Sequence, residues 1–165
     1  MIRTLFKKIV VAYNGSISSL HAVMYGVMMA KIYKCQVKVV YVVDTDSIKR
    51  LVLKKFLVND EGQDFTNELE SSAERDLNHV VKMAKSKGIS LETEVRHGAV
   101  WSEVIKAAND CKADMILLGD SNKSAGTSVL TRGRLGIQDC EIIGSSNCSV
   151  MVVRQPMIEQ MFKLL

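Results

Sequence analysis

The sequence predicts a doubly wound α/β domain built on a parallel sheet of five strands. Five short strand-like runs recur along the 165-residue chain, and most are apolar throughout, as strands buried on both faces are. Segments with the helical spacing of apolar residues separate these runs. Strands that alternate with helices in this way are typical of a parallel sheet with helices on both faces.

The chain begins with two buried strands joined by a helix. The run KIVVAY predicts a strand over Lys8–Tyr13, which ends at the turn signal NGS. The spacing of apolar residues predicts a helix over 18–34, with Ser16 or Ser18 as its N-cap. The run VKVVYVV predicts the second strand over 37–43. Two parallel strands joined by a helix form a right-handed βαβ unit.

Two helical segments and an edge strand follow. Residues 45–65 contain an amphipathic piece and then the turn signal Asn59-Asp60-Glu61-Gly62. This segment is interpreted as a lid, a dimer contact or a helical insertion that packs on the domain, and the insertion is the simplest of the three. Residues 68–87 predict a helix that Gly88 terminates. The alternating run LETEVR predicts an edge strand over 91–96 with one exposed face.

The last third predicts two more strands and a tail. Trp101, Val104, Ile105 and Ala108 mark a helix, and residues 115–118 and 149–154 form the fourth and fifth strands. A short helix closed by Gly144 lies between those strands. We expect one domain over residues 1–155 and an amphipathic tail over 156–165, which either covers the last strand or packs on its own subunit.

Composition argues against several classes of function. The net charge is +4, but lysines and arginines are scattered among acids, so we expect no nucleic-acid binding. The longest apolar segment, AVMYGVMMA, falls well below the roughly 20 residues of a membrane span, so we expect no membrane insertion. Four cysteines without a C-x-x-C pair, and an N-terminal apolar stretch too short for a signal peptide, favour the cytoplasm. Because no hydrolase, zinc-protease or P-loop motif occurs, we expect no enzyme activity.

A glycine-bearing stretch, GDSNKSAGTSVLTRGRLGIQDC, directly follows the fourth strand. Glycine lets a backbone approach a phosphate closely, and a helix N-terminus such as the one predicted after Gly136 favours anions. In doubly wound sheets, ligands bind beyond the carboxyl ends of the strands where the strand order reverses. If the first and fourth strands are neighbours there, Asn14 and Gly119 face one crevice.

Three segments resemble the universal stress protein family. KKIVVAYNGSISSLHAV resembles its opening, VKVVYVVD its second strand, and ADMILLGDS followed by CSVMVVR its final third, so that the resemblance covers about residues 5–154. The family implies a Rossmann-like sheet of the adenine nucleotide alpha hydrolase type, ordered 3-2-1-4-5. Its nucleotide-binding members carry the loop G-x2-G-x9-G-[ST].

Mapped onto this chain, the family loop places its glycines at Gly119, Gly126 and Gly136. The two-residue gap becomes six residues, and Ile137 stands where the family has serine or threonine. A rival register over 133–145 leaves no room for the short helix. Asn14 stands where ATP-binding members usually carry aspartate, and asparagine keeps an acceptor oxygen while losing the charge.

The resemblance implies a regulatory or sensor domain that binds an adenine nucleotide, ATP or AMP, with Mg²⁺ alongside ATP. It also implies a homodimer that pairs residues 149–154 with their copy. The expected nucleotide contacts are Ala12, Tyr13, Asn14, Val42, Leu118, Gly119, Gly126, Gly136, Ile137 and Gln138. The longer glycine loop and Ile137 favour an alternative, a protein of the same fold that has lost nucleotide binding and acts as a dimeric protein-interaction module.

Overall fold

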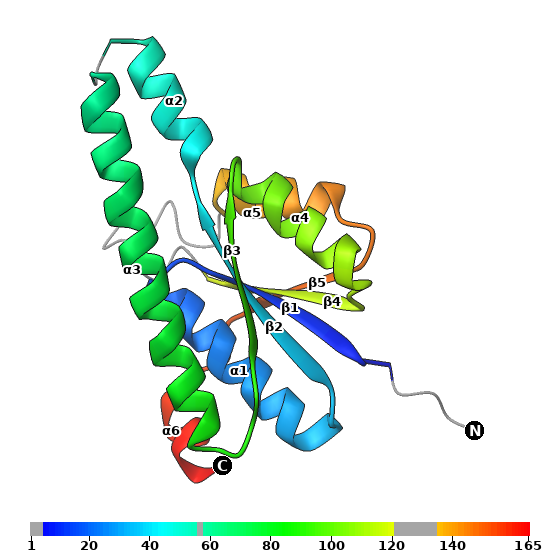
Figure 1. Cartoon of the computed structure of the whole chain (residues 1–165). Helices are drawn as coiled ribbons and strands as arrows, with labels where there is room; N and C mark the ends of the chain where they lie inside the picture. The colour runs from blue at the N-terminus through cyan, green and yellow to red at the C-terminus, as the bar shows by residue number, and fades with distance from the viewer. Residues whose placement is uncertain (1–4, 56–57, 121–134) are drawn as a thin grey trace.

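The computed structural model describes residues 5–55, 58–120 and 135–165, and these residues form one five-stranded parallel sheet (Figure 1). Its spatial order is β3-β2-β1-β4-β5, which confirms the predicted fold class and strand order. The strands are β1 (Lys8–Tyr13), β2 (Gln36–Val43), β3 (Glu92–His97), β4 (Met115–Gly119) and β5 (Ser149–Val153).

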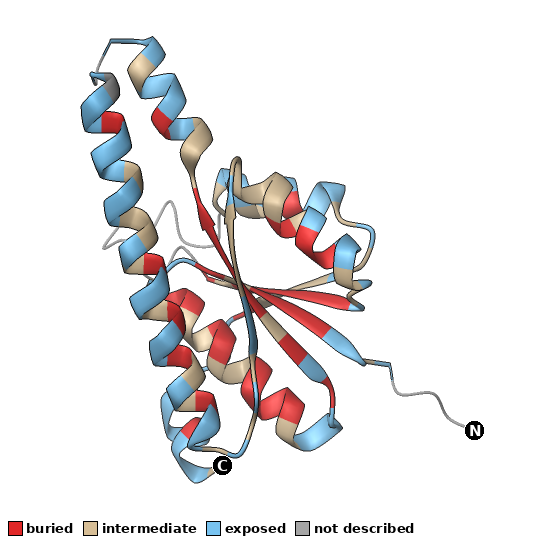
Figure 2. Ribbon diagram, in the orientation of Figure 1, coloured by how far each residue is buried: buried red, intermediate tan, exposed pale blue. Residues whose placement is uncertain are grey.

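Helices cover both faces of this sheet. On one face lie α1 (Ile17–Tyr33), α3 (Asn59–Lys85) and α6 (Ile158–Leu164), and on the other lie α4 (Val100–Cys111) and α5 (Ile137–Ser145). Within β1, Val11 packs toward α1 while its neighbour Val10 packs toward α4, and both are fully buried. Figure 2 shows the same burial along the central strands. The strands are apolar throughout because successive side chains enter two different cores.

The strand order reverses at β1. This strand pairs with β2 on one side, with Tyr13 opposite Tyr41, and with β4 on the other, with Val11 opposite Leu117. The chain leaves β1 for α1 on one face of the sheet and passes from β4 to α5 on the other face. The carboxyl ends of β1 and β4 therefore border an opening between the two helical layers, where ligands of such sheets bind.

The predicted turn at residues 59–62 is wrong, because these residues form the first turn of the long helix α3. Asp60 and Glu61 suit that place, since the N-terminus of a helix favours negative charge, and Glu61 Oε2 accepts a hydrogen bond of 3.0 Å from the backbone N–H of Val58. The chain reverses earlier, after α2 (Thr45–Leu53), where Lys55 has a positive φ of 59°. The helix-stop prediction at Gly144 is also wrong, because α5 continues to Ser145.

The C-terminal tail packs on its own subunit. Ile158 and Phe162 of α6 are buried in the core that α1 and α3 share, and Glu159 Oε1 lies 3.0 Å from His21 Nε2 on α1. Of the two alternatives for the tail, the structure therefore shows the second. Among the described helices, none combines the length and the apolar character that crossing a membrane requires.

Candidate functional site

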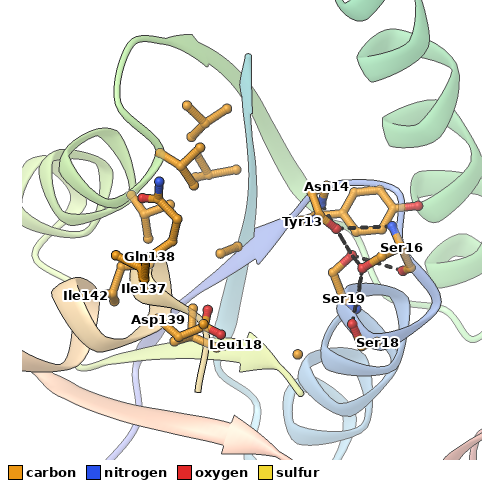
Figure 3. A pocket seen from close by; sticks show the side chains of 17 residues that line it. Tyr13, Asn14, Ser16, Ser18, Ser19, Leu118, Ile137, Gln138, Asp139 and Ile142 are labelled. Atoms are coloured by element: carbon orange, nitrogen blue, oxygen red, sulfur yellow. Dashed lines mark hydrogen bonds between the residues drawn. The ribbon is translucent and has the colours of Figure 1, made fainter. Parts of the chain in front are cut away.

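A cavity of about 490 Å³ lies at the point where the strand order reverses (Figure 3). This volume is within the range of small-molecule binding sites. The lining residues come from the carboxyl-terminal halves of β1, β2 and β4 and from the first two turns of α1, α4 and α5 or the residues just before them. They are Ala12, Tyr13, Asn14, Ser16, Ser18, Ser19, Val40, Val42, Val100, Val104, Leu118, Gly119, Gly136, Ile137, Gln138, Asp139 and Ile142.

The structure brings nearly all of the predicted site residues to this cavity. Those that line it are Ala12, Tyr13, Asn14, Val42, Leu118, Gly119, Gly136, Ile137 and Gln138. Gly126 lies outside the described residues. What each of them contacts in a bound ligand stays a prediction, because the structure shows their places in the wall only.

Sequence reasoning missed three groups of lining residues. Ser16 and Ser18 were interpreted only as alternative caps of α1, and Ser19 was given no role, although Ser18 and Ser19 are buried and all three line the cavity. Val40 was missed although it lies two residues before Val42, and alternate residues of a strand share one face. The third group comes from α4 and from α5 after its first two residues, and it carries no local signal, because tertiary packing alone brings these side chains to the cavity; its members are Val100, Val104, Asp139 and Ile142.

One end of the cavity is an apolar slot. Val40 and Val42 of β2 point toward the same core as Val104 of α4 and Ile142 of α5, and each of the four side chains is at most 8% exposed. Leu118 of β4 belongs to the same cluster. Apolar side chains of this kind form most of the lining of small-molecule sites.

The opposite end is polar and is organised by Asn14. Its Oδ1 accepts hydrogen bonds from the Ser16 backbone N–H at 3.1 Å and from the Ser19 hydroxyl at 2.8 Å (Figure 3). Ser16 in turn caps α1, because its hydroxyl accepts a 3.2 Å bond from the Ser19 N–H. Since a backbone N–H requires an oxygen acceptor, this network fixes the orientation of the amide and leaves its nitrogen as the group that can donate to a ligand.

Gln138 presents a second amide from the other wall, across the cavity from Asn14 in Figure 3. Its Oε1 accepts a 3.2 Å hydrogen bond from the Trp101 N–H, which ties the start of α5 to the start of α4. The amide nitrogen again remains as a donor. Two amide donors and three helix N-termini therefore surround the cavity, and this arrangement suits acceptor-rich or anionic ligands.

Gly119 has a packing role that the sequence did not reveal. A Cβ at this position would collide with the backbone carbonyl of Ser18, because the end of β4 is pressed against the first turn of α1. Gly136, the N-cap of α5, has a φ of −62°, a conformation open to any residue. Ile137 is 82% exposed at the cavity rim and brings no hydroxyl to it.

The tyrosine at the end of β1 is held neutral. Burial raises the pKa of Tyr13 to about 12, and the nearby Asp76 carboxylate adds to the effect. The Tyr13 ring packs edge-on against Tyr41, whose pKa is also raised by burial. In the part of the chain that the structure describes, no group of three His, Cys, Asp or Glu residues is placed to hold a metal ion.

Comparison with known proteins gives a match along nearly the whole chain. A sequence model described as "Universal stress protein family" matches residues 5–154. The universal stress protein MJ0531 of Methanocaldococcus jannaschii is 32% identical over 158 residues, which cover 92% of this chain and 84% of that protein. The universal stress protein YxiE of Bacillus subtilis is 27% identical over 155 residues, covering 91% of this chain and 100% of that protein.

Solved structures share the fold. The hypothetical protein MJ0577 aligns with a TM-score of 0.73 at 23% identity, covering 92% of this chain and 99% of that one. A universal stress protein from Archaeoglobus fulgidus in complex with dAMP aligns with a TM-score of 0.62 at 15% identity, and the alignment covers 91% of this chain and 99% of that one. A universal stress protein family protein from Arabidopsis thaliana with AMP bound aligns with a TM-score of 0.62 at 16% identity, and the alignment covers 93% of this chain and 94% of that one.

Proposed function

The chain belongs to the universal stress protein family, and on that premise we propose that it is a regulatory or sensor domain that binds an adenine nucleotide, ATP or AMP. The observation that carries this proposal is the cavity at the carboxyl ends of β1 and β4, which combines an apolar slot with two amide donors. A nucleotide has the matching parts, a flat base and an anionic phosphate group.

Three proteins of this fold support the class of ligand. Their structures are described as complexes with cAMP, with dAMP and with AMP. All three ligands share the adenine base and differ in the sugar and phosphate. The shared base fits the apolar end of the cavity.

We assign the parts of the nucleotide to parts of the cavity. The base enters the slot beside Val42, and the backbone of Ala12 and Tyr13 borders it. The amide nitrogen of Asn14 donates to the base or the ribose. The phosphates lie at the N-terminus of α5, near Gly136 and Gln138, where N–H groups and the helix dipole favour negative charge.

Magnesium enters this proposal only with ATP. The described residues hold no metal-ligand cluster, and Asp139 is the one aspartate or glutamate among the described lining residues. Mg²⁺ binds proteins through few carboxylates when phosphates and water supply its other ligands. We therefore propose that the ion arrives as part of the ATP complex rather than as a resident of the protein.

We propose a binding role rather than catalysis, in a cytoplasmic homodimer. The four cysteines are free thiols, the state expected in a reducing compartment. Among the described strands, β5 pairs only with β4, so its outer edge offers unpaired backbone groups. A second copy of β5 across a two-fold axis would satisfy them.

A second candidate is a domain of the same fold that no longer binds nucleotide and acts through its dimer surface. Ile137 favours it, because this residue is 82% exposed at the rim and has no hydroxyl for a phosphate. A mass spectrum of small molecules released from freshly purified, denatured protein separates the two. An adenine nucleotide at a level comparable to the protein supports the first candidate; calorimetric titrations with ATP and AMP that both stay silent support the second.

A further inference from the structure

A helical hairpin stands apart from the nucleotide cavity. α2 and the first half of α3 run antiparallel and extend beyond the carboxyl end of the sheet (Figure 1). They meet at Gly62, where a Cβ would lie 2.9 Å from Val52 Cγ2, so the glycine allows the two helices to approach closely. Figure 2 shows that most of the hairpin surface is exposed.

This hairpin exposes more apolar surface than its own packing needs. Leu53 is 81% exposed, Val58 65%, Phe65 45% and Leu51 40%. A groove of about 480 Å³ runs between the two helices, with Val52 and Leu53 on one wall and Gly62 and Thr66 on the other. Several exposed large apolar residues on one helical hairpin mark an interaction site more often than isolated exposed residues do.

The two arms of the hairpin carry opposite charges next to the turn that joins them, although the first turn of α2 also holds Asp46. Residues 49–55 include four lysines and arginines and no acid, whereas residues 60–70 include five acids and no lysine or arginine. The exposed members include Lys49, Arg50, Lys54, Asp60, Asp64 and Glu68, and within the described residues none of these six forms an ion pair. Helix dipoles favour acids at the start of α3 and bases at the end of α2, but they leave the charges without partners.

We infer that the hairpin docks against the hairpin of a second copy of this chain, with the basic helix of each copy facing the acidic helix of the other. A two-fold axis makes every contact twice, so a self-complementary surface is required. The opposite charges of the α2 and α3 arms meet this requirement, because a single two-fold contact brings each basic arm to an acidic one. A purely basic or purely acidic partner would match only one of the two helices.

The positions of the charged residues along the helix axes agree with this arrangement. Because the antiparallel helices meet at Val52 and Gly62, Lys54 lies level with Asp60, and Arg50 lies level with Asp64. A two-fold axis along the hairpin keeps these levels and brings each cation beside the acid of the partner. The four helices would then form a bundle that covers Leu51 and Phe65.

This contact is distinct from the proposed pairing of β5. β2, which leads into α2, and β5 lie on opposite sides of β1 in the sheet, so both contacts can form on one subunit. Together they would assemble dimers into tetramers or chains. The inference does not rest on nucleotide binding.

Three variants of the full chain test this inference by sedimentation velocity. The acid variant carries Lys49→Glu, Arg50→Glu and Lys54→Glu; the base variant carries Asp60→Lys, Asp64→Lys and Glu68→Lys; the swapped variant carries all six changes. We expect the acid and base variants each to self-associate about tenfold more weakly than the natural chain, because both of their helices then have the same sign. The swapped variant, and an equimolar mixture of the acid and base variants, should associate as the natural chain does.

Controls separate misfolding from lost association. Far-UV circular dichroism and thermal unfolding must show that each variant folds, and Leu51→Asn in the natural background should weaken association without any change of charge. Association that none of the single-helix reversals weakens, or that the mixture fails to restore, overturns the inference. A natural chain that forms no assembly beyond the β5 pair also overturns it and leaves the hairpin to a different protein.

Discussion

The side-chain oxygen of Asn14 lies 2.8 Å from the Ser19 hydroxyl, and this contact joins the end of β1 to the first turn of α1 at the mouth of the cavity. The same oxygen accepts the Ser16 N–H. Asn14 therefore fixes the chain where it leaves the sheet, and it presents its amide nitrogen for a ligand.

Replacing Asn14 should show how far its side-chain oxygen stabilises this turn. Asn14→Ala removes the acceptor and should lower the free energy of unfolding by about 1 kcal/mol, because the Ser16 N–H and the Ser19 hydroxyl lose a partner. Asn14→Asp keeps an oxygen for both donors and should stay within about 0.5 kcal/mol of the natural chain. Urea unfolding measures both values. Equal losses in the two variants would show that the oxygen does not hold this turn.

Gly119 should tolerate no side chain. Gly119→Ala places a Cβ against the Ser18 carbonyl and should destabilise the fold by about 1–3 kcal/mol, because strand β4 or helix α1 must shift. Gly144→Ala is the matched control, since a Cβ there meets no atom within 4 Å and alanine favours the helix by up to about 1 kcal/mol. If chemical denaturation finds Gly119→Ala as stable as the control, the close approach of β4 to α1 is incorrect.

Tyr13 should make stability depend on alkaline pH. Its pKa is about 12 in the folded chain against 10.0 for the ordinary phenol, so the unfolded chain loses this proton first as the pH rises. The folded state then binds more protons than the unfolded state, and the free energy of unfolding falls as the pH rises from 10 toward 12. Tyr13→Phe should make that fall shallower in urea titrations at several pH values. If the free energy of unfolding falls with pH equally steeply in Tyr13→Phe and in the natural chain, the Tyr13 phenol is exposed to water in the folded state.

The strands, the strand order and most of the cavity could be predicted from the sequence. Buried parallel strands such as KIVVAY carry a strong local signal, because both faces must be apolar. The order itself came from the resemblance to a family. Once β1 and β4 are neighbours, the residues that follow them meet at the crevice without further information.

The parts that could not be predicted depend on contacts between distant residues. The link between Gln138 and Trp101 spans 37 positions, and the fit of Gly119 against Ser18 spans about a hundred. The turn prediction at residues 59–62 was wrong for a different reason. Asn, Asp, Glu and Gly suit both a turn and the first turn of a helix, and only the packing of Gly62 on Val52 decides between the two.

The central claim is that amide donors around the cavity receive an adenine nucleotide, and titration calorimetry with AMP on the natural chain and on Gln138→Glu tests it most directly. Glutamate keeps an oxygen for the Trp101 N–H but replaces the donor with a negative charge. Ser145→Glu, on the same helix but outside the cavity wall, controls for added charge. We expect AMP to bind the natural chain and the Ser145 variant equally, and to bind Gln138→Glu at least about tenfold more weakly. Equal binding by all three proteins, or no heat with any of them, would contradict the account.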